Sequence, residues 1–154
     1  MSAEKRQYRM KRRAELEAQT RQRITESAVA LHGTLGPART SISAIAEHAG
    51  VRRSTVYRHF PDERALFAAC SAHWSAANPL PDLAAWESVA DPDARLSDAL
   101  EELYGFYRRN EDMLANLVRD EPAVRAVAEQ FGEFREYLAA ARGGRRCGRR
   151  SGMR

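Results

Sequence analysis

Apolar residues recur along most of the chain at intervals of three and four, the spacing that gives a helix one buried face. Ile24, Ala28 and Leu31 form the first such stripe, which ends at Gly33. No segment shows the sustained alternation of apolar and polar residues that a half-buried strand requires. The pattern therefore predicts an all-α protein whose first helix begins near Glu15, after a polar lead-in.

A second helix of about two turns is predicted after residue 40. Thr40 and Ser41 supply hydroxyl groups that cap a helix N-terminus, and Gly50 ends the helix in the left-handed conformation that other residues avoid. The buried face of this helix is formed by Ile42, Ile45, Ala46 and Ala49.

Two more helices are predicted before the middle of the chain. Residues 53–60 form a short helix closed by Pro61, and Asp62 caps a longer helix from Glu63 to about Ala77. The inner side of the longer helix is formed by Leu66, Phe67, Cys70 and Trp74. Two prolines within residues 78–81 forbid a continuous helix, so we place a domain boundary there.

Three amphipathic helices with acidic outer faces are predicted beyond this boundary, at residues 93–109, 111–119 and 122–142. Their apolar positions are Leu96, Leu100, Leu103, Tyr104, Tyr107, Met113, Leu114, Leu117, Val118, Val124, Val127, Phe131, Phe134 and Leu138. The predicted organisation is a flexible basic arm (1–14), a first helical domain (15–77), an incomplete second helical domain (78–142) and a tail (143–154).

The tail is rich in Gly and Arg and has no apolar periodicity, so we expect it to be disordered. An out-of-frame reading of GC-rich DNA would produce such a string. The rival interpretation is an RNA-binding arm, although the interleaved aromatic residues typical of such arms are missing.

Charge is distributed unevenly along the chain. Residues 1–60 carry 12 Lys and Arg against 5 Asp and Glu, residues 61–142 carry 8 against 16, and the last twelve residues carry 5 against none. A basic block beside an acidic one indicates that the first sixty residues face an anionic partner and the middle of the chain does not.

Other function classes receive little support. Cys70 lies in an apolar helical stripe and Cys147 among arginines, which favours a reducing compartment, and no stretch is apolar enough to cross a membrane. We therefore expect a cytoplasmic protein. Cys70 and His73 have no second ligand pair, and no catalytic constellation or glycine-rich phosphate loop is visible. No enzyme activity, metal or cofactor is expected.

The order of elements around Gly50 predicts a helix-turn-helix. A short capped helix ends at Gly50, a tight turn follows, and a second short helix begins near Arg53. In this motif the second helix enters the DNA major groove, so its apolar residues are confined to the side facing the domain. Val56 and Phe60, spaced by four, meet that requirement.

The residues of this motif resemble the signature of the TetR family of transcriptional regulators. The resemblance rests on TSISAIAEHAGV at 40–51, STVYRHF at 54–60 and Asp62 to Leu66, and it extends over about Arg23 to Phe67. It implies an all-α homodimer in which three N-terminal helices bind double-stranded operator DNA. A fourth helix then links them to a domain that binds a small-molecule effector and dimerises. The implied function is sequence-specific regulation of transcription, by a repressor that the effector releases.

The resemblance also implies roles for individual residues. Base contacts are expected from Arg53, Ser54 and Tyr57, because an arginine there can donate two hydrogen bonds to guanine. Phosphate or sugar contacts are expected from Ser41, Arg52, Thr55, Arg58 and His59. Ser41 has capping as an equally good interpretation. The basic residues from Lys5 to Arg13 add counterion-releasing charge and are placed to reach a neighbouring groove.

The sequence also departs from the family pattern. Arg52 stands where the family has a capping residue such as Ser, and Glu63 stands where a lysine commonly grips phosphate. An effector pocket is expected among Trp86, Tyr104, Tyr107, Phe131 and Phe134, although such residues at helical spacing also form cores. The family's two further long helices, which pair across the dimer, are not recognised before the tail.

Two alternatives stay open on this basis. One is a truncated small-molecule or protein-interaction module that has little DNA affinity. The other is RNA binding through the basic ends of the chain, which predicts a preference for single strands.

Overall fold

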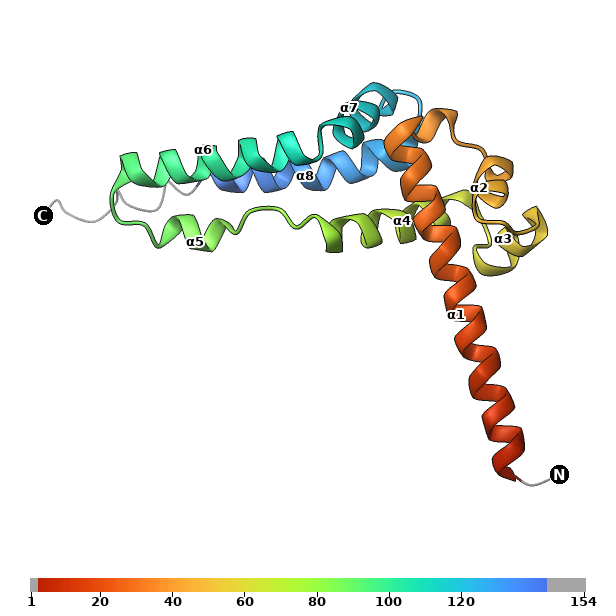
Figure 1. The fold of residues 1–154 in the computed structure, drawn as a ribbon. Coiled ribbons are helices and arrows are strands. Elements are labelled where there is room, and N and C mark those ends of the chain that lie inside the picture. The colour runs from red at the N-terminus through yellow and green to blue at the C-terminus, as the bar shows by residue number, and fades with distance from the viewer. Residues whose placement is uncertain (1–2, 144–154) are drawn as a thin grey trace, which may run out of the picture. The chain divides into compact units, whose positions relative to one another are not determined.

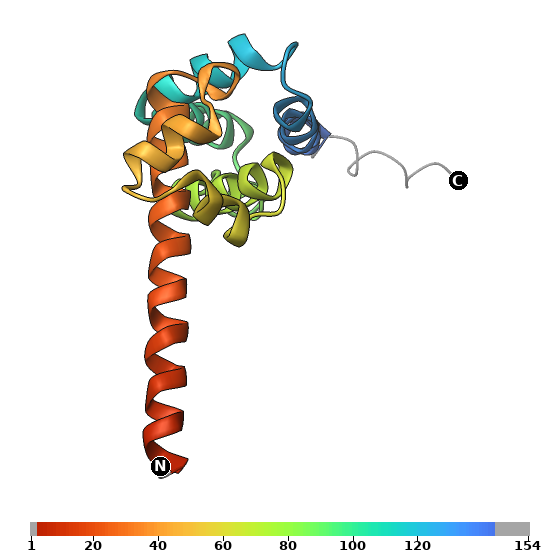
Figure 2. The same cartoon turned by 90° about the vertical axis from the view of Figure 1, so that its right-hand side faces the viewer.

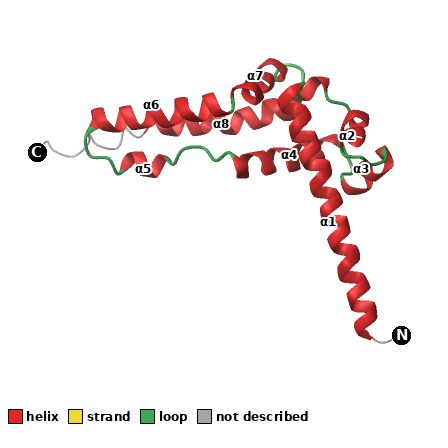
Figure 3. Cartoon of the chain, in the orientation of Figure 1, coloured by secondary structure: helices red, strands yellow, loops and turns green. Residues whose placement is uncertain are grey.

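The computed structural model describes residues 3–143 of the chain (Figure 1). Within these residues the chain forms eight α-helices, a single 3-10 turn and no strand, which confirms the all-α prediction (Figure 3). The elements are α1 (Ala3–Thr34), η1 (Pro37–Arg39), α2 (Ile42–His48), α3 (Arg53–His59), α4 (Glu63–Ala77), α5 (Leu83–Glu87), α6 (Pro92–Arg109), α7 (Glu111–Asp120) and α8 (Arg125–Gly143). Of the predicted tail, residues 144–154 lie outside this description.

The chain divides into two compact units, Met1–Ala77 and Asn78–Arg154, which we call unit 1 and unit 2 and describe separately. The division follows α4 and falls at the segment that contains Pro79 and Pro81.

Helix α1 is much longer than its apolar stripe predicts. It begins at Ala3, so the predicted start near Glu15 is wrong. Residues 3–19 contain neither Gly nor Pro and consist mostly of Ala, Glu, Lys, Arg, Gln, Leu and Met, which favour helix without any buried face. The Arg13 Nε donates to Glu17 Oε1 at 3.2 Å, one turn further on, and supports this solvent-exposed part.

The core of unit 1 is built from one face each of α1, α2, α3 and α4. Helix α1 packs against the other three helices, and Figure 2 shows them gathered around its C-terminal half. The side chains buried together are Ile24, Ala28, Ile42, Ile45, Ala46, Ala49, Val56, Phe60, Leu66 and Cys70. Every predicted inner residue of α2 is therefore buried.

Two details of unit 1 show how its ends and core are fixed. Helix α4 begins after Asp62, whose Oδ1 accepts a hydrogen bond from the Ala65 amide at 2.7 Å, and it ends at Ala77 as predicted.

Burial raises the pKa of the Cys70 thiol to about 12, so this cysteine is an inert core residue.

Unit 2 contains one helix that the sequence pattern did not predict. Helix α5 has only five residues, too few for a periodic stripe, and it is capped by Asp82, whose Oδ1 accepts from the Ala84 amide at 2.9 Å. Its Trp86 is buried, and the indole Nε1 donates to Glu102 Oε2 on α6 at 2.8 Å. The last predicted helix, α8, begins at Arg125, three residues later than expected.

Part of the predicted inner face of α6 is wrong. Leu96, Leu100 and Tyr104 are 50%, 45% and 63% exposed. The reason is that α6 carries two adjacent apolar stripes. The second stripe contains Phe106, which is 2% exposed, and it is this one that turns inward.

Candidate nucleic-acid interface

The turn between α2 and α3 is fixed by a glycine-dependent helix end. The Gly50 amide donates to the Glu47 carbonyl at 3.0 Å, and the Val51 amide donates to the Ala46 carbonyl at 2.9 Å. This pair of bonds is the Schellman arrangement, which needs a left-handed residue after the helix. Gly50 has φ of 65°, as the sequence predicts. The turn sets the direction in which α3 leaves α2.

The rotation of α3 about its axis is fixed by two apolar anchors. Val56 and Phe60 are each only 1% exposed and pack in the core of unit 1. As a result, the opposite side of α3 faces solvent. Its exposed residues are Arg53, Ser54, Tyr57 and Arg58. This surface has the composition and position expected of a recognition helix.

Arg53 and Tyr57 form a pair one turn apart on this surface. The Arg53 Nη2 donates to the Tyr57 hydroxyl at 3.3 Å, and the guanidinium carbon lies 5.6 Å from the centre of the tyrosine ring. The hydrogen bond that Arg53 donates to Tyr57 is the largest cause that raises the pKa of Arg53. Because a guanidinium has five N–H donors, this bond leaves four free to bind another partner. The contact with Tyr57 therefore holds the Arg53 side chain in place while its other N–H groups can still bind a partner.

Three other predicted contact residues lie near the N-terminal ends of α2 and α3. Arg52 occupies the N-cap position of α3, and its side chain makes no capping bond. Thr55 is half-buried on the side next to the core. Ser41 caps α2, because its Oγ accepts from the Ala44 amide at 3.1 Å. Its hydroxyl hydrogen remains available as a donor.

His59 occupies a different environment from the rest of α3. Its Nε2 is buried and has no hydrogen-bond partner among the described residues. Burial lowers the pKa of His59, and the positive charges of Arg58 and Arg21 lower it further. Burial and these charges therefore favour the neutral form of the ring, and its Nε2 is shielded from solvent. The phosphate contact predicted for it stays a prediction.

Arg21 is a positioning residue that the sequence pattern did not single out. Its Nη1 donates to the His59 carbonyl, at the last residue of α3, and its guanidinium carbon lies 4.0 Å from the centre of the Phe60 ring. A cation at a helix C-terminus is favourable, and so is a cation over an aromatic face. Arg21 thereby ties α1 to α3. Its only sequence signal is its place one turn before Ile24.

The residues predicted for an effector pocket do not all come together. In unit 2 the Phe134 ring lies 6.4 Å from both Tyr107 and Phe131, so these three predicted residues share one cluster. Tyr137, which was not predicted, stacks on Phe134 at 6.1 Å and donates through its hydroxyl to the Pro81 carbonyl at 2.9 Å. Trp86 is buried against Glu102, and Tyr104 is exposed.

Two kinds of feature are absent from the part of the chain that the structure describes. No group of three or more His, Cys, Asp or Glu residues is arranged to hold a metal ion. No described helix is long and apolar enough to span a membrane.

Comparisons with known proteins agree with this geometry. Residues 24–70 match the family model for bacterial regulatory proteins of the tetR family, a span that starts in α1 and ends in α4. Comparison with curated protein sequences gives no significant match.

Two solved structures are similar in fold. One, described as a TetR-family transcriptional regulator from Mesorhizobium loti, has a TM-score of 0.56 and 19% identity, over 76% of this chain and 60% of that one. The other is the multidrug binding protein EbrR complexed with imidazole, with a TM-score of 0.53 and 26% identity, over 82% of this chain and 69% of that one. Our chain thus spans 60% of the length of the first of these proteins.

The family match covers the turn at Gly50, the anchors of α3 and the helices that hold them. Through residues 24–70, the N-terminal unit of the chain is similar to bacterial regulatory proteins of the tetR family.

Proposed function

We propose that this protein is a sequence-specific DNA-binding repressor that a small-molecule effector releases from its operator. One observation carries the proposal. The polar side of α3, with Arg53, Ser54, Tyr57 and Arg58, is exposed because Val56 and Phe60 hold the other side in the core. A short helix presented in this way fits the major groove of a DNA duplex.

The geometry supports base contacts for some residues of the interface and backbone contacts for others. Arg53 lies in the first turn of α3, where side chains reach base edges, and its free N–H donors match the O6 and N7 acceptors of guanine. Ser54 and Tyr57 complete the base-reading set. Ser41, Arg52, Thr55 and Arg58 are assigned to the sugar-phosphate backbone, where they set the register of α3 without reading sequence. His59 joins this set only if its ring turns outward.

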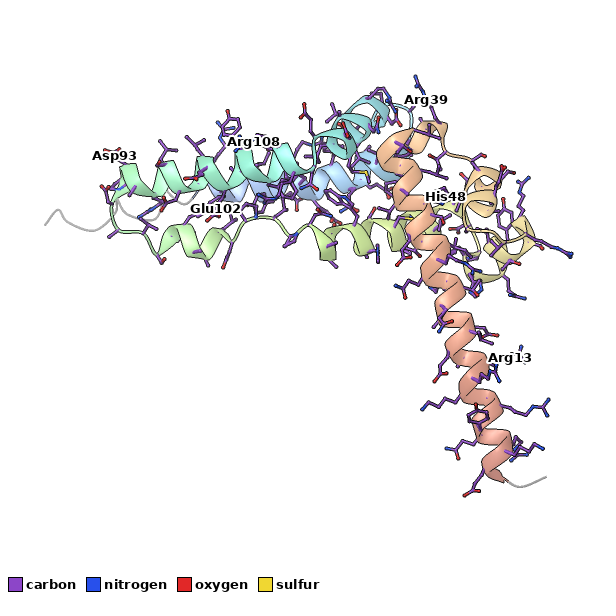
Figure 4. The ribbon with its side chains drawn as sticks, in the orientation of Figure 1. Arg13, Arg39, His48, Asp93, Glu102 and Arg108 are labelled. Atoms are coloured by element: carbon purple, nitrogen blue, oxygen red, sulfur yellow. The ribbon has the colours of Figure 1, made fainter. Side chains whose placement is uncertain are left out.

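The experiment begins with selection of duplexes from a random 30-base-pair pool by the purified full chain. Arg53→Ala should relax the selected sequence at one position, at a cost of about 1–3 kcal/mol for the preferred base. Thr55→Ala should weaken binding to all duplexes alike. Arg108→Ala, at an exposed position on α6 (Figure 4), is the matched control and should change neither property.

Salt dependence separates operator binding from the alternatives. Binding through several phosphates should weaken steeply as salt is raised, because condensed counterions are released on binding. If the pool yields no enriched sequence and Arg53→Ala binds like the parent, the proposal is wrong. The chain would then be a helical module with little DNA affinity.

The proposed effector site is the aromatic cluster of Tyr107, Phe131, Phe134 and Tyr137 in unit 2. Burial raises the pKa of both tyrosines, so their hydroxyls stay protonated and can donate hydrogen bonds. The similarity to a protein described as multidrug binding, complexed with imidazole, supports a small aromatic ligand. Imidazole and larger aromatic compounds should be tested for release of the selected duplex from the parent chain and from Phe134→Ala.

A homodimer is part of the same proposal. Two copies related by a two-fold axis would read two half-sites about one helical turn apart, so the selected sequence should be an inverted repeat. The mass of the protein in solution, measured by light scattering with and without that duplex, tests this directly. A monomer on a single half-site would contradict it.

A further inference from the structure

The N-terminal half of α1 is a charged helix outside the core of unit 1. We call residues 3–20 the α1 extension. Every side chain from Glu4 to Gln19 is exposed. Figure 2 shows the extension running on from unit 1 beyond α2 and α3 as a single uninterrupted helix. Because core packing does not stabilise this segment, its function is expected to depend on its surface residues.

The surface of the extension is strongly basic. Lys5, Arg6, Arg9, Lys11, Arg12 and Arg13 lie within nine residues that contain no Asp or Glu. Arg13 pairs with Glu17, yet 83% of its side-chain surface remains open to solvent, and it projects away from the rod in Figure 4. The clustering favours an anionic partner over a role in solubility alone.

Some of the basic residues are continuous with the face of α1 that packs in unit 1. Eighteen residues make five complete turns of an α-helix, so residues that far apart lie directly above one another. Arg6 therefore lies over Ile24 and Arg13 over Leu31, and both of these apolar residues pack toward the core of unit 1. The extension thus carries Arg6 and Arg13 on the side of α1 that packs against α2, α3 and α4.

The apolar and aromatic residues of the extension argue against three other partners. Tyr8, Met10 and Leu16 are spaced by two and six, so they form no stripe that a partner helix or a membrane surface would cover. Single-stranded RNA is usually bound by basic grooves with several stacking aromatic residues, and the extension has only Tyr8. A rigid rod of positive charge fits the regular phosphate array of a duplex better.

We propose that the α1 extension is a phosphate-binding rod that lies along the DNA backbone beside the sequence read by α3. This rests on the proposed function of α3. The contacts of Arg21 with the His59 carbonyl and the Phe60 ring fix the direction of α1 relative to α3. Arg13 and Lys5 lie 8 and 16 residues before Arg21, or about 12 and 24 Å along the helix axis. At about 3.4 Å per base pair, the rod covers about four to seven base pairs of flanking DNA.

The rod should add affinity without adding sequence preference, because phosphate contacts position a protein but do not read bases. Each neutralised phosphate contributes about 0.9 to the slope of log affinity against log salt. Loss of four contacts should therefore reduce that slope by between 3 and 4, roughly. The ratio of the parent's DNA affinity to that of such a variant should therefore fall about a hundredfold between 50 and 200 mM salt.

The test uses the full chain and the duplex selected through α3, either trimmed to the selected sequence or carrying ten base pairs of flank on each side. A variant with Lys5, Arg6, Arg9 and Arg13 changed to Gln keeps the helical propensity of α1 and removes four charges. The matched control changes four exposed arginines of unit 2 to Gln, at Arg108, Arg109, Arg125 and Arg142. A third variant, Ala14→Pro, keeps every charge but breaks the rod.

The expected result is that the parent and the control bind the flanked duplex at least tenfold more tightly than the trimmed one. The four-glutamine variant and Ala14→Pro should lose that difference while selecting the same sequence. If the four-glutamine variant distinguishes flanked from trimmed DNA as the parent does, the rod is not a phosphate contact. A preference of the parent for single-stranded RNA over the flanked duplex would overturn it as well.

These failures differ from a failure of the proposed function. That failure would appear as the absence of any selected sequence and of any effect of Arg53→Ala. The inference about the rod fails by itself when selection and the Arg53 effect are present and the flank effect is not.

Discussion

Similar apolar patterns in the two units of the chain predict buried residues correctly in unit 1 and only partly in unit 2. In unit 1, the predicted inner residues of α2 and α3 are all buried, and Ile45, Val56 and Phe60 are at most 2% exposed. In unit 2, three of the five predicted inner residues of α6 are exposed by 45% or more. A periodic stripe therefore predicts burial only where neighbouring helices are available to cover it. Unit 1 supplies its own cover within 77 residues, because four helices converge on one core.

The exposed stripe of α6 is the part of unit 2 where sequence and structure disagree most. Leu96, Leu100 and Tyr104 are four residues apart and so lie along one side of the helix. All three side chains are 45% exposed or more, whereas Phe106 on the neighbouring stripe is buried. The comparison can be tested by asking whether the same substitution has unequal costs in the two units.

The largest expected effect comes from truncating a core residue of unit 1. Ile45→Ala removes a side chain that is 2% exposed and should lower the free energy of unfolding of unit 1 by about 2–5 kcal/mol. Leu100→Ala removes a side chain that is 45% exposed and should cost about 1 kcal/mol or less in unit 2.

The chain offers one tryptophan in each unit to measure these costs separately. Trp86→Phe leaves Trp74 in α4 as the fluorescent reporter of unit 1, and Trp74→Phe leaves Trp86 in α5 as the reporter of unit 2. Each truncation is then compared with its own single-tryptophan parent during denaturation by urea. A cost for Leu100→Ala equal to that of Ile45→Ala would break the comparison, since it would mean that the exposed stripe is covered in solution.

The residues that could be predicted from sequence are those whose local chemistry is decisive. Ser41 caps the start of α2, Gly50 forms the turn at its end, and Asp62 caps the start of α4, so each residue makes the capping or turn contact expected of its type. The long extension of α1 was missed because helix propensity without a buried face leaves no periodic signal. Helix α5 was missed because five residues are too few to show one.

Long-range contacts explain the rest of what sequence reasoning could not predict. Arg21 and His59 are 38 positions apart, and their contact depends on how α1 packs against α3. The aromatic cluster of unit 2 likewise joins α6 to α8, and only the fold shows that Tyr104 is outside it while Tyr137 is inside. The base-contact roles of α3 remain predictions until binding is measured.

A smaller effect, of opposite sign in the two units, is expected from a single methyl group added to a glycine. Gly50→Ala should destabilise unit 1 by about 1–2 kcal/mol, because φ of 65° is left-handed and disfavoured for alanine. An added Cβ at Gly50 would meet no atom within 4 Å, so the cost is conformational and not steric.

Gly132 in α8 is the matched position in unit 2. An added Cβ there also meets nothing within 4 Å, and the glycine lies inside a helix. Gly132→Ala should therefore stabilise unit 2 by about 0.5–1 kcal/mol. Both changes are measured by urea denaturation with the tryptophan reporters. Equal signs for the two substitutions would show that the turn at Gly50 is not left-handed in solution.

The smallest expected effect is a dependence of stability on pH that is confined to unit 1. All four histidines lie in this unit, and burial lowers the pKa of His59 below its ordinary value. When the pH falls through about 6.5, the unfolded chain takes up a proton at this position and the folded one does not. The stability of unit 1 should therefore decrease between pH 7.5 and 5.5.

His59→Gln should reduce that decrease, whereas His48→Gln, at an exposed position on α2, should leave it as in the parent. The Trp86 signal of unit 2, which has no histidine, should respond to none of these substitutions. The same decrease in His59→Gln as in the parent would show that the buried ring is not what makes unit 1 sensitive to acid.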